Sequence, residues 1–295
     1  MTSLEATQQK ICERYGYKII KFNKETGEVK DFHGTIKDFD LKEKEIKAYK
    51  IKKLRNHDLR EKYGSFLWCI FTNCTVYFPE LDSATLARLI YSLTYMGYNN
   101  YLKIGRQTKI KKSDLKRKLK LPDDKFEDFF KKMIDENIYI LDNEYIKISD
   151  SWFKRGETNL KKYFKLDKSV TRIYFNGIRE LYEQCRLNQH NALGYIYKIL
   201  PFVSIEYNIV CHNPEETDMD KLEPMTLPEL CDLIGYDKSN ANKLMKTMSA
   251  YQIDGKCMIK YVIDGTDHRN SKIYVNPKIY YSGNHGSEVK ILGVL

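Results

Sequence analysis

Residues 226–251, TLPELCDLIGYDKSNANKLMKTMSAY, decide the fold of this chain. Thr226 and Glu229 have the spacing of a capping box, which starts a helix by satisfying amides that lack helical partners. Gly235 suits the left-handed residue that ends a helix, and Asp237 can cap the helix that follows. The stretch therefore predicts two helices joined by a tight turn.

The segments around this helix pair complete a familiar unit. Residues 189–205 form an apolar helical pattern, and residues 208–211 suit a short strand. After the helix pair, residues 257–263 and 271–275 are rich in β-branched and aromatic residues, which favours a hairpin around 264–270. Helix, helix-turn-helix and hairpin in this order predict a winged helix.

The same order occurs earlier in the chain. Residues 83–99 show helical spacing of apolar residues, with Ser83 as a candidate N-cap. Leu121-Pro122 separates a helix expected over 112–120 from one that Asp123 can cap, and strands follow at 138–141 and 144–148. This predicts a first winged helix.

An internal repeat relates the two units. Apolar agreement could also arise from two amphipathic helices of equal period, but the shared ending, residues 146–156 against 273–283, favours duplication. We place 12 additional residues in the second wing to align these endings. A shift of 115 residues pairs the following apolar positions: Ile110 with Met225, Leu115 with Leu230, Leu119 with Ile234, Phe129 with Leu244, Met133 with Met248, and Ile138 with Ile253.

The expected fold class is α+β, mainly helical, with two tandem winged helix-turn-helix units after an N-terminal α/β extension. The extension contains a hairpin at 17–32 and a charged helix at 41–63. A helix is also expected over 170–185, and the last residues suggest a loose tail. The predicted domains are 1–82 (extension), 83–156 (first winged unit), 157–168 (connector), 169–284 (second winged unit) and 285–295 (tail).

Composition restricts the class of protein. The chain has 295 residues, 42% of them hydrophobic, and no apolar run near the roughly 18 residues that a membrane span needs. Its start lacks the charged-then-apolar pattern of a signal peptide. Seven cysteines without a CxxC motif suit reduced thiols rather than a disulfide framework. We expect a cytoplasmic protein with no membrane partner.

The formal net charge is +10, and the positive charge is concentrated between Lys103 and Lys120. Asp114 is the sole acid there among nine basic residues. Such a block is typical of a surface that binds phosphate, although a solvated lysine-rich helix has the same composition. By contrast, residues 215–223 are acidic and suit a solvated loop.

The second unit is the predicted base reader. In a helix-turn-helix the second helix enters the major groove, while the first helix and the wing meet phosphates. The same polar residues could instead solvate and cap a surface helix. The expected double-stranded DNA contacts of this unit are Lys238, Ser239, Asn240, Asn242, Lys243, Lys246, His268, Arg269 and Lys272.

The first unit departs from this pattern. Its second helix opens with Asp123 and Asp124 and continues with Glu127 and Asp128, which would repel a phosphate-lined groove. This unit could grip the DNA backbone without reading bases, or present its acidic helix to a protein. Its predicted backbone contacts are Lys109, Lys111, Lys112, Lys116, Arg117 and Lys120.

A reaction centre is not indicated. The histidines and cysteines show no metal-ligand spacing, and the sequence contains neither a GxxxxGK[ST] loop nor a GxSxG motif. We therefore expect no metal, no cofactor and no enzymatic activity.

The stretch Tyr274-Val275-Asn276-Pro277-Lys278-Ile279-Tyr280-Tyr281-Ser282-Gly283 ends the second unit. It resembles the end of the winged helix in replication initiators of Gram-positive plasmids and related phages, of the RepL kind. The first unit departs from that pattern, because Ser149-Asp150 replaces Asn-Pro. The resemblance implies an initiator that binds repeated sites at an origin and recruits host replication proteins, without chemistry of its own.

Two other functions use the same modules. A transcriptional regulator would bind a promoter, and the apolar segment 66–78 would then be a surface for a homodimer. A protein-binding adaptor would use the winged helices against a partner other than DNA.

Overall fold

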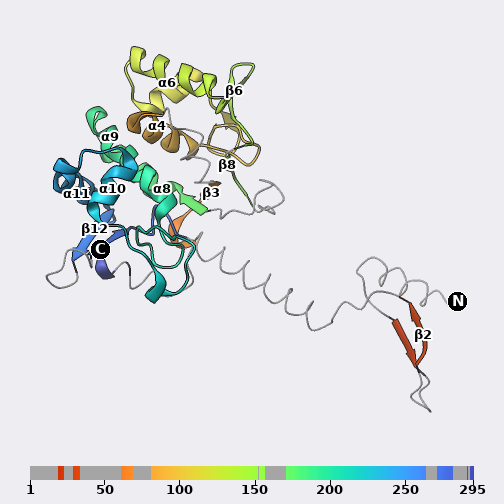
Figure 1. Ribbon diagram of the computed structural model, residues 1–295. Coiled ribbons are helices and arrows are strands. Elements are labelled where there is room, and N and C mark those ends of the chain that lie inside the picture. Colours follow the sequence, from red (N-terminus) through yellow and green to blue (C-terminus); the bar gives the residue numbers. More distant parts are fainter. Residues whose placement is uncertain are drawn as a thin grey trace. The chain divides into compact units, whose positions relative to one another are not determined.

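The computed structural model describes residues 19–22, 29–33, 61–69, 81–151, 153–156, 171–263, 271–281, 291 and 293–295. The chain divides into two compact units, residues 1–59 and 60–295 (Figure 1). In the N-terminal unit, β1 (Ile19–Phe22) and β2 (Val29–His33) pair antiparallel, which confirms the predicted hairpin. Of the predicted helix 41–63, residues 61–63 are helical and the remainder lies outside the described residues.

The main unit combines helices with small antiparallel sheets, so the fold is mixed α/β. Asp82, rather than the predicted Ser83, caps its first long helix, since its carboxylate accepts the Thr85 amide at 2.9 Å. The elements of the first predicted unit are α4 (Ser83–Leu93), β4 (Lys103–Ile104), β5 (Thr108–Lys109), α5 (Lys112–Leu119), α6 (Asp123–Asp135), β6 (Tyr139–Asp142) and β7 (Tyr145–Ile148).

The second predicted unit contains equivalent elements. Gly235 is left-handed with φ 69°, and the Asp237 carboxylate accepts the Ser239 amide at 2.9 Å, as predicted. The elements are α9 (His190–Ile199), α10 (Leu227–Ile234), the 3₁₀ turn η4 (Lys238–Asn240), α11 (Ala241–Ala250), β10 (Gln252–Ile253), β11 (Lys256–Cys257), β12 (Ile259–Ile263) and β13 (Ser271–Val275).

The helix predicted over 170–185 is wrong at its start. Thr171–Tyr174 forms β9, and the helix α8 begins only at Phe175 and ends at Gln184. The reason is tertiary, because β9 pairs antiparallel with β3 (Phe66–Cys69) along its whole length.

The helix pairs match in detail at the shift of 115 residues. This shift carries α5 onto α10, and it carries α6 onto η4 and α11. It also carries Lys120, with φ 53°, onto Gly235, so both turns use a left-handed residue. The twelve apolar residues that the sequence aligned are all buried, at 3% exposure or less.

One of the aligned pairs is nevertheless wrong. The carbonyl of Ile138 accepts the amide of Ser149, whereas in the second unit the carbonyl of Met258 accepts the amide of Asn276. Ile138 is therefore equivalent to Met258 rather than to Ile253. The additional residues do not all lie in the wing: 5 of the 12 make the β10–β11 hairpin, and 7 lengthen the wing. We call these two related stretches, 83–156 and 169–284, the first and second repeats.

A central sheet joins the repeats. Its order is β8 (Phe153–Lys154), β3 and β9, and Tyr280 bridges to Ile173 of β9. Phe153 and Tyr280 hold equivalent places after the two wings, so the sheet is built alike from both sides. Although β3 lies within the predicted extension 1–82, its pairing places it with the repeats. Its described side chains, residues 66–68, are buried and cannot form the predicted dimer surface; residues 70–78 lie outside the described residues.

Helices α4 and α9 pack side by side between the repeats (Figure 1). They approach so closely that a Cβ on Gly194 would lie 1.7 Å from the Ser83 carbonyl oxygen. Leu89 and Leu193 are fully buried in one hydrophobic core that extends through both repeats. The repeats are thus parts of one packed body.

The predicted loose tail is wrong at its end. Ile291 and Leu295 are buried, and the Lys260 ammonium donates to the Val294 carbonyl at 2.6 Å. The predicted connector, residues 157–168, lies outside the described residues. None of the helices that the structure describes is long and apolar enough to cross a membrane.

His190 lies buried where α9 meets α4 and α8. Its ring centroid is 4.6 Å from that of Tyr182, and its Nδ1 has no hydrogen-bond partner among the described residues. Burial, together with the nearby Arg88 guanidinium, lowers the pKa of His190 from 6.5 to about 4. The imidazole is therefore neutral at pH 7.

We expect Gly194→Ala to lower the free energy of unfolding by about 3 kcal/mol, because the added carbon forces α4 and α9 apart. This loss exceeds the gain of about 1 kcal/mol in helix propensity. Urea unfolding measures both terms together. Gly235→Ala is the control: its surroundings are open, so only its left-handed backbone costs about 1 kcal/mol. Wild-type stability for Gly194→Ala would contradict the close packing.

The folding free energy should depend on pH through His190. The folded pKa lies below the unfolded one, so stability is fully present above pH 6.5 and is lost as the pH falls toward 4. The loss attributable to this group is at most about 3 kcal/mol. Urea unfolding between pH 7 and pH 4.5 should show a steeper decline for the wild type than for His190→Gln. Equal slopes for the two proteins would show that His190 takes up no proton when the chain unfolds.

Candidate nucleic-acid interface

The start of the second helix in the second repeat is ordered by Asp237. Its carboxylate accepts the Ser239 amide at 2.9 Å, the Ser239 hydroxyl at 2.8 Å and the Asn240 carboxamide at 3.1 Å. These hydrogen bonds lower the pKa of Asp237, which stays ionised at neutral pH. Ser239 and Asn240 are therefore held in place, while both remain exposed.

The outer face of α11 is polar and carries positive charge. Leu244 and Met248 are buried on its inner face, while Asn242, Lys243 and Lys246 are exposed. Neither lysine forms an ion pair with any described residue, whereas Lys238 pairs with Asp232 at 2.6 Å. The face thus offers carboxamides and two uncompensated ammonium groups together.

The helix α10, which precedes α11 in the helix pair, is also fixed at its start. The Glu229 carboxylate accepts the amide of Thr226 at 2.7 Å and its hydroxyl at 2.8 Å, as the capping-box spacing predicts. These bonds, and His212 at 3.6 Å, lower the pKa of Glu229. Both helices of the pair consequently start at fixed places.

The predicted wing is described only at its base, where β12 pairs with β13. Lys272 lies on β13 opposite Val262, while the tip, residues 264–270, lies outside the described residues together with the predicted contacts His268 and Arg269. Asn276 is fully buried where the wing ends, and its carboxamide donates to the Cys257 carbonyl at 3.1 Å. The Asn of the Tyr-x-Asn-Pro stretch therefore has a structural role here.

Five of the six predicted backbone contacts of the first repeat are paired with acids. Lys112 contacts Glu127 at 2.6 Å, and the pairing crosses from α5 to α6. Such exposed pairs contribute little stability, but they neutralise basic side chains that are predicted from the sequence to bind phosphate. The other predicted backbone contacts in ion pairs are Lys111 (with Glu144), Lys116 (with Asp123), Arg117 (with Asp114) and Lys120 (with Glu183).

Four basic residues of the block lie apart from those pairs: Lys118 on α5, whose ammonium lies 5.7 Å from the ring centroid of Tyr95, and three on the β4–β5 hairpin. Lys103, Arg106 and Lys109 form no ion pair with any described residue. The Lys109 ammonium lies 3.7 Å from the ring centroid of Tyr101. We call residues 103–109 the basic hairpin. Of the three basic residues on the hairpin, only Lys109 is among the contacts predicted from the sequence. Their position before α5, outside the helix pair that carries Asp114, Asp123 and Glu127, distinguishes them from the ion-paired basic residues.

The outer face of α6 contrasts with that of α11. The shift of 115 residues places Asp123 at the position of Lys238, Asp124 at Ser239, Glu127 at Asn242 and Asp128 at Lys243. All four acids are exposed. Equivalent helices therefore present opposite charge, as the sequence predicted.

A metal site is not found in the described part of the chain. There, no group of three or more histidine, cysteine or acidic side chains is placed to hold a metal ion. Of the cysteines that the structure describes as free thiols, Cys211 and Cys231 are buried.

Comparison of the chain with protein-family models, with curated proteins and with solved structures finds no match. The resemblance to plasmid and phage initiators stays a prediction from the sequence.

Proposed function

We propose that the chain is a sequence-specific double-stranded DNA-binding protein whose two repeats are winged helix-turn-helix units. In this proposal α11 enters the major groove and the β12–β13 wing lies along the backbone. The observation that carries the proposal is the exposed face of α11, where carboxamides stand beside lysines without ion-pair partners. Carboxamides bond adenine edges, and ammonium groups bond guanine or phosphate.

The first repeat would act differently. Its helix α6 presents carboxylates where α11 presents polar and basic groups, so base reading by α6 would cost repulsion from the phosphates. Since one core fixes α6 and α11 relative to each other, the first repeat would set the orientation of the reading helix.

Within DNA binding we favour replication initiation. This rests on the Tyr274–Gly283 stretch and its resemblance to RepL-like initiators. An initiator of this kind would bind repeated sites at an origin and recruit host replication proteins. A transcriptional regulator would use the same surface at a promoter.

A protein-binding adaptor is the second candidate, and the acidic face of α6 favours it. Two of the four exposed carboxylates, Asp124 and Asp128, form no ion pair with any described residue and suit a basic protein surface. Such a protein would bind its partner and show no affinity for duplex DNA.

The test of DNA binding uses duplexes selected from a random pool, at 50 and 200 mM salt. We expect Asn242→Ala/Lys243→Ala to lower affinity for the selected site about 10- to 100-fold and to reduce discrimination against other sequences, because these groups would bond base edges. Lys125→Ala/Lys131→Ala on α6 is the matched control and should change affinity less than about twofold. Fluorescence anisotropy measures both.

Absence of duplex binding by the wild type at 50 mM salt would overturn the proposal and favour the adaptor. Equal losses for both double variants would show that the contact is with phosphate alone. If the wild type binds duplex DNA, footprints of the chain on the DNA around its own gene distinguish an initiator from a transcriptional regulator. Several protected repeats at an origin support an initiator, whereas one protected site over a promoter supports a regulator.

A further inference from the structure

The basic hairpin has an equivalent in the second repeat. The amide of Ile110 donates to the carbonyl of Leu102 at 2.8 Å, and the amide of Met225 donates to the carbonyl of Val210 at 3.0 Å. Each of these bonds joins the two ends of a segment, here called an excursion, that leaves a sheet and returns to it. The excursions begin just after Tyr101, which bridges to Lys147, and just after Ile209, which bridges to Tyr274. We call the excursion in the second repeat, residues 212–223, the acidic loop. Hairpin and loop thus occupy the same place in the two repeats.

The two excursions have opposite charge. The basic hairpin has three basic residues and no acid, while the acidic loop has five acids and one lysine. Each also exposes one large hydrophobic side chain, Ile104 in the hairpin and Met219 in the loop, both at 39%. The hairpin is open at its turn, because nothing lies within 4 Å of a Cβ on Gly105. The two surfaces therefore complement each other in charge and in their apolar centres.

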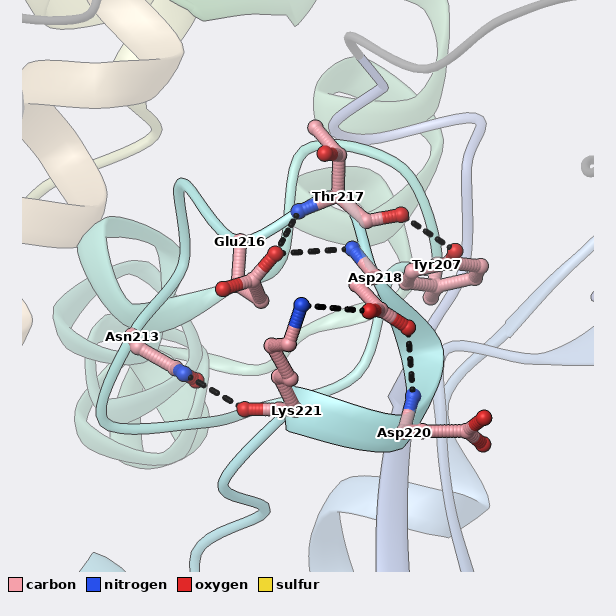
Figure 2. Close-up of polar contacts among 7 residues, drawn as sticks. All are labelled: Tyr207, Asn213, Glu216, Thr217, Asp218, Asp220 and Lys221. Atoms are coloured by element: carbon pink, nitrogen blue, oxygen red, sulfur yellow. Dashed lines mark hydrogen bonds and ion pairs between the residues drawn. The ribbon is translucent and has the colours of Figure 1, made fainter.

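The acidic loop is preformed by its own hydrogen bonds (Figure 2). The Glu216 carboxylate accepts the amides of Thr217 and Asp218 at 2.8 Å, and the Asn213 carboxamide donates to the Lys221 carbonyl at 2.9 Å. The Asp220 side chain points away from the other labelled residues and forms no ion pair with any described residue. A partner would thus meet an ordered surface and lose little conformational entropy in binding it.

We propose that the basic hairpin docks on the acidic loop of a second copy of this chain. Lys103 and Arg106 have no ion-pair partner among the described residues of their own chain, so their charges are available to another molecule. A second copy supplies the complementary surface at the equivalent place of its second repeat. Ile104 and Met219 would meet at the centre, with the charged groups around them.

The contact would be weak in solution and sensitive to salt. Two short excursions bury little area, which is typical of transient interfaces, and exposed charge pairs are screened within about 10 Å at 0.1 M salt. Copies held side by side on neighbouring DNA sites would raise the effective concentration of each surface for the other. The inference concerns the free protein and holds whether or not the chain binds DNA.

The experiment is sedimentation of the full chain, treated with nuclease, at rising concentration in 50 and 500 mM salt. We expect concentration-dependent association at 50 mM that is lost at 500 mM. Lys103→Glu/Arg106→Glu should weaken association about tenfold or more, because its hairpin becomes acidic and repels the acidic loop. Asp220→Lys/Glu223→Lys should also weaken association about tenfold or more, because its loop becomes neutral and no longer attracts the basic hairpin. An equimolar mixture of the two should associate again, because the unchanged hairpin of the loop variant then meets the unchanged loop of the hairpin variant. Lys125→Glu/Lys131→Glu on α6 is the control for net charge.

A wild-type chain that stays monomeric throughout would overturn the proposal. So would a mixture that fails to associate although circular dichroism shows both variants folded. If Lys103→Glu/Arg106→Glu weakens duplex binding but leaves association unchanged, the hairpin is a phosphate contact and the proposal is wrong. Loss of DNA binding by the α11 variant has no bearing on these outcomes, so failure of the proposed function remains distinguishable.

Discussion

Two helices, one from each repeat, approach so closely that position 194 has no room for a side-chain carbon. The rest of the structure depends on this contact and on the pairing of β3 with β9 beside it. Together they bring the apolar faces of both repeats into one core. Because protein interiors resist deformation, a shared core fixes the distance and angle between α6 and α11. The surfaces that face outward are consequently arranged by residues far from them.

The repeats are alike inside and opposite in charge outside. In the second repeat α10 meets its neighbours through Leu227 and Cys231, which are buried. The equivalent positions of α5 are Lys112 and Lys116, which form ion pairs with α6. With these apolar contacts, Lys243 and Lys246 on α11 form no ion pair with any described residue, whereas the ion pairs of Lys112 and Lys116 neutralise carboxylates of α6. A difference in packing thus becomes a difference in what each surface can bind.

The helix pair of the second repeat and its turn could be predicted from the sequence because their signals are local; in the first repeat the predicted cap is wrong, since Pro122 rather than Asp123 stands at the N-cap of α6. Thr226, Gly235 and Asp237 each act within a few residues, and each has the predicted role. The strands β3 and β9 could not be predicted in the same way, because their pairing joins residues about 100 positions apart. The same holds for the end of the chain, where Leu295 is buried and the Val294 carbonyl accepts a hydrogen bond from the distant Lys260 of β12.

The candidate site shows the same division. The exposed face of α11 could be predicted, since helical periodicity alone separates Lys243 and Lys246 from Leu244 and Met248. The pairing of Lys116 with Asp123 could not, because a charge count along the chain takes no account of how α5 and α6 pack. Nor could the count show that Lys103 and Arg106 stand apart from the other cations.

The central sheet has the symmetry of a two-fold contact. Its strand pairing is symmetrical about Trp68 and Arg172, and equivalent residues, Phe153 and Tyr280, pair on its two sides. This is the arrangement of a two-fold homodimer whose subunits pair edge to edge through one strand each. When two such subunits are joined in a single polypeptide, their sequences no longer have to be identical. In such a chain each half can carry its own surface charge, as the two repeats do here, while the contact between the halves lies in the core.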